Sequence, residues 1–565
     1  MNLNEEVELV TGSEILLKSL LKEGVECVFG YPGGAVLYIY DAMHGNEEFR
    51  HLLTRHEQGA IHAADGYARA TGKTGVCLAT SGPGATNLVT GIATAYMDSV
   101  PLVVITGNVA SHLIGTDAFQ EADIVGITQP ITKHSFFVRR VEDLAKTVKE
   151  AFYIAGTGRK GPVLIDIPKD VSAALAPFEY PETVSLPGYR LVDRPEAAVI
   201  GRLLEAVRAA RKPVIVAGAG VIHAEASAEL LTFAERARIP VTTTMLGLGG
   251  FPGGHPLWIG MPGMHGTVSA NRALTECDFL LAVGARFDDR VTMRLDAFAP
   301  EAKIAHIDID AAEIDKLVET FISVVGDARE VLAMLNERYS EAPRTDEWVD
   351  YLLGLKERYP LRYREEEGVL KPQFVIEMLS RTTSGEAIVT TDVGQHQMWA
   401  AQFFTYKHPR SFLSSGGLGT MGFGFPSAIG AQIGNPDRLV ISINGDGGIQ
   451  MCSQELAICS IHQIPVKVVV INNRTLGMIR QWQEVIYDKR YSHIDLSGSP
   501  DFVLLAQAYG VKGLRADNPK DAERIWATAM EHPGPVLLEF VVDKDELVLP
   551  MIRQGDTLRD MILCE

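Results

Sequence analysis

Short apolar runs rich in β-branched residues alternate with helix-like stretches over most of the 565 residues. This alternation predicts α/β architecture, because parallel strands require crossover helices and are buried on both faces. We therefore expect three domains, each with a central, mostly parallel sheet that is flanked by helices. The runs form three series, at 76–80, 102–106 and 162–168, at 212–220, 279–285 and 304–310, and at 386–394, 438–448 and 466–473.

Two segments without a sustained period separate these series. Residues 176–196 are rich in proline and polar residues, which suits an inter-domain linker. Residues 337–368 are highly charged and partly helical, which suits a surface connection. The chain also exceeds the length at which a single hydrophobic core stops growing. The expected domains are 1–185, 190–345 and 370–545, followed by a C-terminal tail at 546–565.

A faint internal repeat relates the first series to the third. In the first, Pro101 follows the turn "SGPG" by 17 positions, and Asn108 lies 7 positions further on. In the third, Pro465 and Asn472 follow the turn "GDGG" at the same two spacings. Chance can produce such a match, but two similar α/β domains on either side of a third would produce it as well.

The charge balance and the cysteine pattern exclude several function classes. A formal net charge of −19 and a pI near 5.3 argue against nucleic acid or an anionic membrane as a partner. No apolar run approaches the roughly 20 residues that span a bilayer, and the acidic N-terminus lacks a basic targeting segment. The six cysteines include no C-x-x-C pair, which favours a reducing cytoplasm over disulfides or zinc.

Polar residues stand where two predicted strands of the third series end. Asp446 lies between glycines in "GDGG". Asn472, 26 positions after Asp446, and Asn473 end the next run. A glycine-rich turn presents backbone N–H groups to an anion such as phosphate, and carboxylate and amide oxygens suit Mg²⁺. The pattern therefore predicts a metal-bridged di- or triphosphate site. The alternative is that Asp446 is a helix N-cap and that the asparagines are turn residues.

The pairing of "GDG" with two asparagines resembles the signature of thiamine diphosphate (ThDP) enzymes. This resemblance implies that Asp446, Asn473 and the backbone of Thr475 hold Mg²⁺. The triplet "RHE" fits the same family, in which its glutamate bonds N1′ of the aminopyrimidine, and Glu57 matches that glutamate. Positioned proton transfer of this kind typically contributes about 10²- to 10⁴-fold to a rate. Taken alone, Glu57 also fits a helix-dipole partner or a surface acid.

Nine blocks extend the resemblance over almost the whole chain. They make it similar to the catalytic subunits of acetohydroxyacid synthases (acetolactate synthases). The block "GARFDDRVT" is typical of members that bind FAD, and the resemblance implies a structural flavin because carboligation needs no electron transfer. The blocks lie at 29–42, 55–72, 80–107, 117–136, 161–171, 260–267, 284–292, 414–431 and 472–483.

The resemblance also implies roles for residues of the active site. Gly34 would lie near the reactive ring of ThDP, and Gln120 would face substrate oxygens. Phe119 and Met264 would line the substrate channel, with Lys169 at its mouth. Those residues other than Met264 form the implied catalytic set together with Glu57. The further ThDP contacts implied by the family are Pro32, Val393, Gly394, Gln395, His396, Gly419, Met421 (which would enforce the V shape of ThDP), Gly445, Gly447, Gly448, Leu476, Gly477, Met478 and Ile479.

Two more sites depend on the same resemblance. The stretch "AGAGVIHAEA" lacks the third glycine of a dinucleotide fingerprint, so a tight strand–helix turn is its alternative reading. Trp482, with Met264, would favour the extra methyl of 2-ketobutyrate over pyruvate by about 1–3 kcal/mol; the alternative for Trp482 is a helix anchor. The implied FAD contacts are Arg159, Gly218, Ala219, Gly220, Thr244, Met245, Leu246, Met264, His265, Gly284, Ala285, Arg286, Asp288, Arg290, Asp308, Ile309, Asp327 and Ala328.

The implied reaction is that of an acetolactate synthase in branched-chain amino-acid biosynthesis. Pyruvate is decarboxylated on ThDP, and the hydroxyethyl unit passes to a second pyruvate or to 2-ketobutyrate. The family implies a homodimer or homotetramer with active sites at the dimer interface, and a small regulatory subunit as a possible partner. The alternatives are a pyruvate oxidase, a glyoxylate carboligase, which the presence of Glu57 disfavours, and an inactive scaffold on the same fold.

Overall fold

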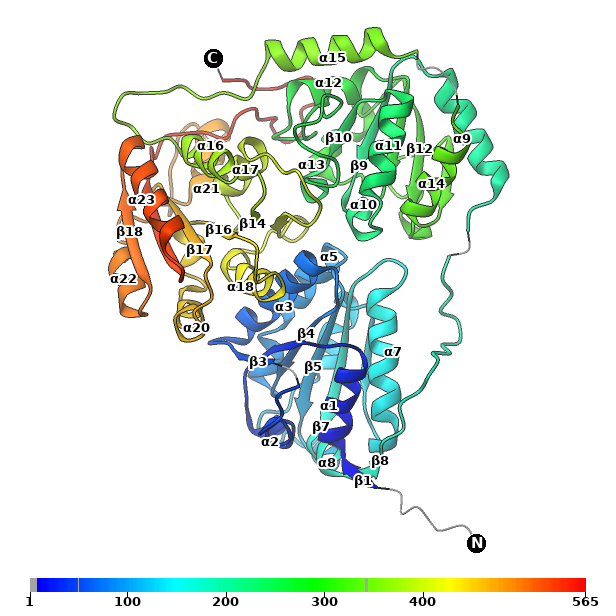
Figure 1. Cartoon of the computed structure of the whole chain (residues 1–565), viewed down its shortest axis with the longest axis vertical. Helices are drawn as coiled ribbons and strands as arrows, with labels where there is room; N and C mark the ends of the chain where they lie inside the picture. The colour runs from blue at the N-terminus through cyan, green and yellow to red at the C-terminus, as the bar shows by residue number, and fades with distance from the viewer. Residues whose placement is uncertain (1–7, 49, 193, 341–343, 565) are drawn as a thin grey trace.

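Three parallel sheets organise the computed structural model, which describes residues 8–48, 50–192, 194–340 and 344–564. The N-terminal sheet lies at the bottom of Figure 1, the central sheet at the upper right and the C-terminal sheet at the upper left. All strand pairs within these three sheets are parallel, which confirms the predicted fold class. No helix of the described residues is long and apolar enough to cross a membrane.

The N-terminal sheet has the strand order β3-β2-β4-β5-β7-β6. A two-stranded antiparallel pair, β1 (Leu9–Thr11) and β8 (Leu175–Pro177), joins the beginning of this domain to its end. The strands are β2 (Cys27–Gly30), β3 (Arg50–Leu53), β4 (Gly75–Ala79), β5 (Leu102–Asn108), β6 (His134–Phe137) and β7 (Pro162–Pro168). The helices are α1 (Gly12–Lys22), α2 (Leu37–Met43), α3 (Glu57–Thr71), α4 (Pro83–Thr86), α5 (Val89–Met97), α6 (Ile124–Thr128), α7 (Leu144–Gly156) and α8 (Lys169–Ala173).

The central sheet has the order β10-β9-β11-β12-β13. The segment that follows β8 runs up the right side of Figure 1 to this sheet, as expected for the 176–196 linker. The strands are β9 (Pro213–Ala217), β10 (Val241–Thr243), β11 (Phe279–Val283), β12 (Lys303–Asp308) and β13 (Ile322–Val325). The helices are α9 (Ala197–Ala209), α10 (Ala219–His223), α11 (Ser227–Ala237), α12 (Val268–Glu276), α13 (Asp289–Thr292), α14 (Ala328–Arg338) and α15 (Asp346–Arg358).

The C-terminal sheet has the order β15-β14-β16-β17-β19-β18. Its strands are β14 (Ile388–Thr391), β15 (Phe412–Ser414), β16 (Val440–Gly445), β17 (Lys467–Asn472), β18 (Lys512–Ala516) and β19 (Val536–Val541). Its helices are α16 (Pro372–Thr382), α17 (Gln395–Phe403), α18 (Gly424–Gly434), α19 (Asp446–Ile449), α20 (Leu456–His462), α21 (Gly477–Ile486), α22 (Phe502–Ala508) and α23 (Pro519–Glu531). Each of the nine predicted runs overlaps one strand of these three sheets.

The internal repeat is a true structural repeat. When strands are ranked by position in the chain, the N-terminal and C-terminal sheets have the same order. The repeat extends to buried side chains, because Asn108 Nδ2 donates to Asp166 Oδ2 at 2.6 Å and Asn472 Nδ2 donates to Glu539 Oε1 at 2.7 Å. Both acids lie on the adjacent strand, opposite the residue two positions before the asparagine.

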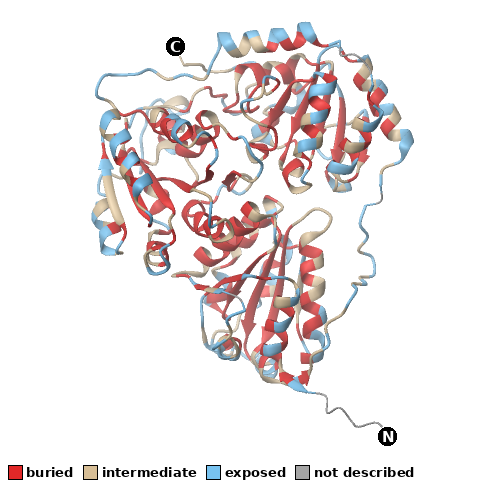
Figure 2. Cartoon of the chain, in the orientation of Figure 1, coloured by how far each residue is buried: buried red, intermediate tan, exposed pale blue. Residues whose placement is uncertain are grey.

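Helices α3 and α18 join the two outer domains through backbone contact. A Cβ added to Gly66 would lie 2.0 Å from the carbonyl oxygen of Ser427, and one added to Gly430 would lie 1.8 Å from that of Ala63. Only glycine permits this approach. Figure 2 shows both helices as mostly buried where the two domains meet. The alanine and glycine spacing after "RHE" therefore serves inter-domain packing.

Two segments pack more deeply than their composition suggests. The predicted surface connection at 337–368 contains α15, which buries Trp348 and Leu352 in the central core. The indole of Trp348 donates to the carbonyl oxygen of Pro213 at 3.0 Å, so this part of the segment belongs to the central domain. The C-terminal tail returns to the same domain, where Ile552 is buried and its N–H donates to the carbonyl oxygen of Met264 at 2.9 Å.

Candidate active site and cofactor cavity

Asp446 lies directly after β16, as the first residue of α19. Its side chain is buried, and Oδ2 has no hydrogen-bond partner among the described residues. Burial raises the pKa of this carboxyl to about 7. Gly445 occupies the N-cap position, and no side chain caps the helix, so the N-cap interpretation of Asp446 is wrong. A buried carboxylate oxygen without a partner is costly unless a cation or a proton compensates it.

The two asparagines after β17 have different partners. Asn472 bonds Glu539 of the neighbouring strand, and its Oδ1 accepts the N–H of Arg474 at 3.0 Å. Asn473 donates to Gln395 Oε1 at 3.1 Å, and its Oδ1 accepts the N–H of Thr475 at 3.3 Å. The N–H of Arg474 also lowers the Asp446 pKa, which brings this turn beside the Gly-Asp-Gly turn. Asn472 therefore bonds a side chain within the sheet, whereas Asn473 bonds Gln395 at the beginning of α17.

Glycines bring three loops of the C-terminal domain close together. A Cβ at Gly394 or at Gly445 would lie 3.0 Å from Cε1 of His396, and one at Gly477 would lie 2.1 Å from Oε1 of Gln395. The ring of His396 is buried, and its Nε2 has no hydrogen-bond partner within the described part of the chain. Burial lowers the pKa of this ring to about 3, so it is neutral. The edge thus offers backbone N–H groups, a carboxylate and amide oxygens, which fits a metal-bound diphosphate.

Glu57 is the first residue of α3, and His56 caps that helix through its Nδ1, which accepts the N–H of Gln58 at 3.1 Å. Asn87 Nδ2 donates to Glu57 Oε2 at 2.9 Å. The preceding turn is held from the C-terminal domain, because Glu455 accepts the N–H of Arg55 on both carboxylate oxygens, at 3.2 and 3.1 Å.

Sequence reasoning missed Asn87 and Glu455 as supports of Glu57. Asn87 stands inside the block 80–107, which was the only signal for it. Burial raises the pKa of the Glu455 carboxyl to about 7.

The other N-terminal candidates lie on a more open face. A Cβ added to Gly34 would meet no atom of the other described residues within 4 Å, and the side chain of Phe119 is 87% exposed. Gln120 has a φ of 63° and packs on Gly82, while the Lys169 ammonium lies 5.9 Å from the ring centroid of Tyr38. Pro32 is exposed as well. Neither these five N-terminal residues nor Asp446 line the cavity that lies among the three domains.

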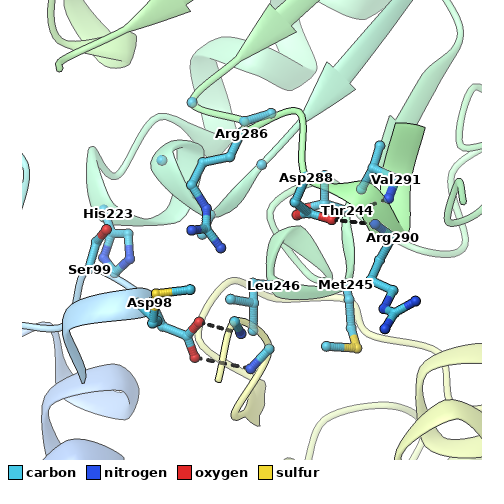
Figure 3. Close-up of a pocket in the computed structure, with 18 of the residues that line it drawn as sticks. Asp98, Ser99, His223, Thr244, Met245, Leu246, Arg286, Asp288, Arg290 and Val291 are labelled. Atoms are coloured by element: carbon cyan, nitrogen blue, oxygen red, sulfur yellow. Dashed lines mark hydrogen bonds between the residues drawn. The ribbon is translucent and has the colours of Figure 1, made fainter. Parts of the chain in front are cut away.

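A cavity of about 710 Å³ lies among the three domains, and Figure 3 shows part of its wall. Its lining includes all 18 positions for which the resemblance implies FAD contacts. It also includes Val393, Gly419 and Met478 from the implied ThDP set, and Trp482. The structure therefore gathers the flavin candidates at one place and joins them to one edge of the ThDP candidates.

The cavity wall combines glycine turns with charged side chains. Gly218, Gly220 and Gly284 are so close that a Cβ on any of them would lie 2.2–2.5 Å from backbone atoms of this group. Arg286 points into the space and donates no hydrogen bond to any described residue (Figure 3). Asp288 instead caps α13 by accepting the N–H groups of Arg290 and Val291 at 3.0 and 3.2 Å.

Arg159, one of the implied flavin contacts, is held by three polar side chains. It donates to Ser99 Oγ at 3.0 Å and pairs with Asp310 at 3.0 Å and with Glu313 at 2.6 Å. The lining residues that sequence reasoning missed include Met97, Asp98, Lys160, His223, Gln397 and the segment 415–418. An open cavity with a free guanidinium, apolar methionines and glycine-framed turns fits an anionic, partly aromatic cofactor such as a dinucleotide.

Comparison with known proteins gives the class first. Three family models match in order: the N-terminal TPP binding domain of thiamine pyrophosphate enzymes at residues 10–127, their central domain at 200–335 and their C-terminal TPP binding domain at 392–540. The fold is thus that of a three-domain thiamine pyrophosphate enzyme.

Curated relatives then narrow the family. The chain is 51% identical to the acetolactate synthase large subunit of Corynebacterium glutamicum over 98% of this chain and 90% of that protein. It is 47% identical to the acetolactate synthase large subunit of Haemophilus influenzae, over 98% of both. It is 50% identical to the probable acetolactate synthase large subunit of Methanocaldococcus jannaschii, over 98% and 95% respectively. The chain belongs to the acetolactate synthase large-subunit family.

Proposed function

We propose that this chain decarboxylates pyruvate and joins the resulting two-carbon unit to a second 2-ketoacid in the biosynthesis of valine, leucine and isoleucine. With pyruvate the product is 2-acetolactate, and with 2-ketobutyrate it is 2-aceto-2-hydroxybutyrate. The observation that carries the proposal is the buried Oδ2 of Asp446 beside the Asn473 turn, which no described residue hydrogen-bonds. The family of the chain points to the same reaction.

The metal and the diphosphate would be held at the edge of the C-terminal sheet. Asp446, Asn473 and the backbone of Thr475 supply hard oxygen ligands, which suit Mg²⁺. The glycine turns at 394 and 445–448 leave room for phosphate oxygens close to backbone N–H groups. When bound, ThDP supplies an electron sink for the carbanion that decarboxylation leaves.

Glu57 would hold the proton that the pyrimidine N1′ shares. Asn87 occupies Oε2 of Glu57 at 2.9 Å, which fixes the carboxylate and leaves Oε1 for the cofactor. Gly84 keeps this side open, since a Cβ there would lie 3.3 Å from Oε1.

FAD would occupy the central cavity without a redox role. The free guanidinium of Arg286 and the contact of Gly218 and Gly220 with Gly284 support this assignment. Trp482 lies in the same lining as Met264, where an indole can discriminate between acceptor ketoacids by one methylene.

A second copy of the chain would complete the active site. Glu57 and Asp446 belong to different domains, and apolar side chains stand exposed near the candidate residues of both. Large exposed apolar sets are typical of interaction surfaces. The exposed side chains are Tyr31, Leu37, Tyr38, Leu113, Ile114, Phe119 and Ile127 in the N-terminal domain, and Leu418, Met451, Ile479 and Ile486 in the C-terminal domain. We extend the proposal to a homodimer or homotetramer in the cytoplasm, with a small regulatory subunit as a further partner.

One assay separates this function from its alternatives. Pyruvate, ThDP, Mg²⁺ and FAD are supplied anaerobically, and the product and the flavin absorbance are measured. Acetolactate with oxidised flavin is expected from the native chain, and none from Glu57→Gln, which keeps the shape of the side chain but cannot carry the proton. Acetate with bleached flavin would point instead to a pyruvate oxidase. Absence of turnover despite bound ThDP would point to a scaffold.

A further inference from the structure

The segment between β15 and α18 separates the flavin cavity from the Gly-Asp-Gly turn. Its residues 415–419 line the cavity, and Met421, at its far end, lies 3.7 Å from the position of a Cβ on Gly447. This segment, which we call the shared loop (residues 415–421), therefore has one face toward each candidate cofactor site. Three of its seven residues are glycines, at 416, 417 and 419, so the free loop has high backbone entropy.

Asp98 holds the cavity side of the shared loop from another domain. Its Oδ2 accepts the N–H of Gly416 at 3.0 Å, and its Oδ1 accepts the N–H of Gly417 at 2.8 Å (Figure 3). Arg69 donates to the same carboxylate at 2.9 Å and to the carbonyl oxygen of Ser414 at 3.0 Å. Asp98 is 4% exposed, so these charge-assisted bonds act in a water-poor environment.

Helix α5, which Asp98 follows directly, holds the other end of the shared loop. Thr94, which lies one turn before Asp98 on α5, places its hydroxyl 2.7 Å from that of Thr420. Within the loop, the N–H of Thr420 donates to Ser415 Oγ at 3.0 Å. Between these fixed ends, Leu418 and Gly419 remain exposed toward the cavity. The loop is thus anchored at both ends and free at its tip.

We propose that the shared loop couples the two cofactor sites, so that flavin in the cavity orders the tip and preorganises the loop for ThDP, with Asp98 as the positioning residue. The inference depends on the proposed function, because it assumes that FAD and ThDP bind where that proposal puts them. Such coupling would give FAD a role in ThDP binding that needs no redox chemistry. A ligand that orders a segment removes part of the entropy cost that the second ligand would otherwise meet.

Two measurements on the native chain test the coupling without enzyme activity. ThDP affinity at fixed Mg²⁺ is measured by quenching of tryptophan fluorescence, with and without saturating FAD. Hydrogen exchange of a peptide that covers the shared loop is measured in four states: without cofactor, with FAD, with ThDP and with both. We expect FAD to tighten ThDP binding by about tenfold, within the usual range of coupling between sites, and ThDP to tighten FAD by the same factor. Exchange of the loop amides should slow when FAD binds.

Asp98→Asn removes the negative charge that binds Arg69 and one of the two acceptors for the loop amides. At saturating FAD, the tightening of ThDP binding should fall below about twofold, and loop exchange should no longer respond to FAD. Thr94→Val loosens the other end without changing side-chain shape and should reduce the coupling in the same direction. The matched control is Asp278→Asn, because Asp278 also accepts two successive backbone N–H groups, at 2.8 and 2.9 Å, but lies outside the cavity lining.

The outcomes separate this inference from the proposed function. If FAD and ThDP both bind the native chain but neither changes the affinity of the other, the inference is refuted and the proposed function stands. Full coupling in Asp98→Asn would refute the positioning role. An equal loss of coupling in the Asp278→Asn control would refute it as well, because the effect would then be general destabilisation. If FAD does not bind the native chain, both the flavin assignment and the inference fail.

Discussion

Glu455 offers a direct test of how the two outer domains are joined. Its carboxylate is fully buried and holds the turn before Glu57 through the N–H of Arg55. Burial raises its pKa from 4.5 to about 7, which means that the folded chain binds this proton more tightly than the unfolded chain does. By linkage, stability falls as the pH rises from about 4.5 to about 7 and then levels off. The full change corresponds to roughly 3 kcal/mol.

The variant Glu455→Gln removes this titration while it keeps one oxygen acceptor for Arg55. In the cofactor-free chain, the variant should unfold at a higher urea concentration than the native chain at pH 8, with a gain of up to roughly 3 kcal/mol. At pH 5 the gain should be under about 1 kcal/mol, since the native carboxyl is then protonated in the folded state.

A surface glutamate supplies the control for this experiment. Glu523→Gln changes an exposed acid that pairs with Arg381, and it should shift the urea midpoint little at either pH. The same difference between Glu455→Gln and the native chain at pH 5 and pH 8 would contradict the reasoning, because the effect would then not arise from the buried proton. A variant that is less stable at pH 8 would contradict it more strongly.

Three further predictions address the cofactor and substrate sites. Asp446→Ala should abolish Mg²⁺-dependent ThDP binding, measured by calorimetry, and should leave FAD binding intact when it is measured without ThDP; a loss limited to the stability of a helix cap, about 0.5–2 kcal/mol, would contradict the metal role. Gly284→Ala should reduce flavin binding at least tenfold by fluorescence titration, because φ is 54° and the new Cβ would lie 2.5 Å from the Cα of Gly220; unchanged affinity would place the flavin elsewhere. Trp482→Leu should lower the preference for 2-ketobutyrate over pyruvate in a competition assay by about 10-fold or more, while acetolactate formation continues. An unchanged product ratio would remove Trp482 from the acceptor site.

The sheet core of each domain could be read from the chain because its signals are local. Continuous apolar runs mark buried parallel strands, and glycine turns mark their ends, so each of the nine predicted runs coincides with a strand, whereas the other eight described strands of the three sheets had no predicted run. The spacing of Asn108 and Asn472 revealed the repeat for the same reason. The acids that these asparagines bind were not visible, because Asp166 and Glu539 lie on other strands and are paired only by the sheet register.

The two interpretations of Asp446, as a helix N-cap or a metal ligand, show where local signals end. A helix N-cap and a metal ligand both follow a strand and precede a short helix, so the sequence allowed either interpretation. The fold decides between them because β16 continues through Gly445, which takes the cap position and leaves Asp446 inside the first turn. Burial of Oδ2 without a partner among the residues that the structure describes is a property of the packed sheet edge and of no local pattern.

The sequence by itself determined the three α/β units, the glycine turns and the residue types that phosphate and Mg²⁺ require, because those properties depend on neighbours along the chain. The tertiary structure alone decided which remote groups meet. Glu455 reaches Arg55 across 400 positions, and Asp98 reaches Gly416 across 318. A buried acid accepts any correctly placed N–H group, so its side chain does not specify its partner. Only the packing of α3 on α18, with backbones in contact, fixes those distances and brings the cofactor loops into place.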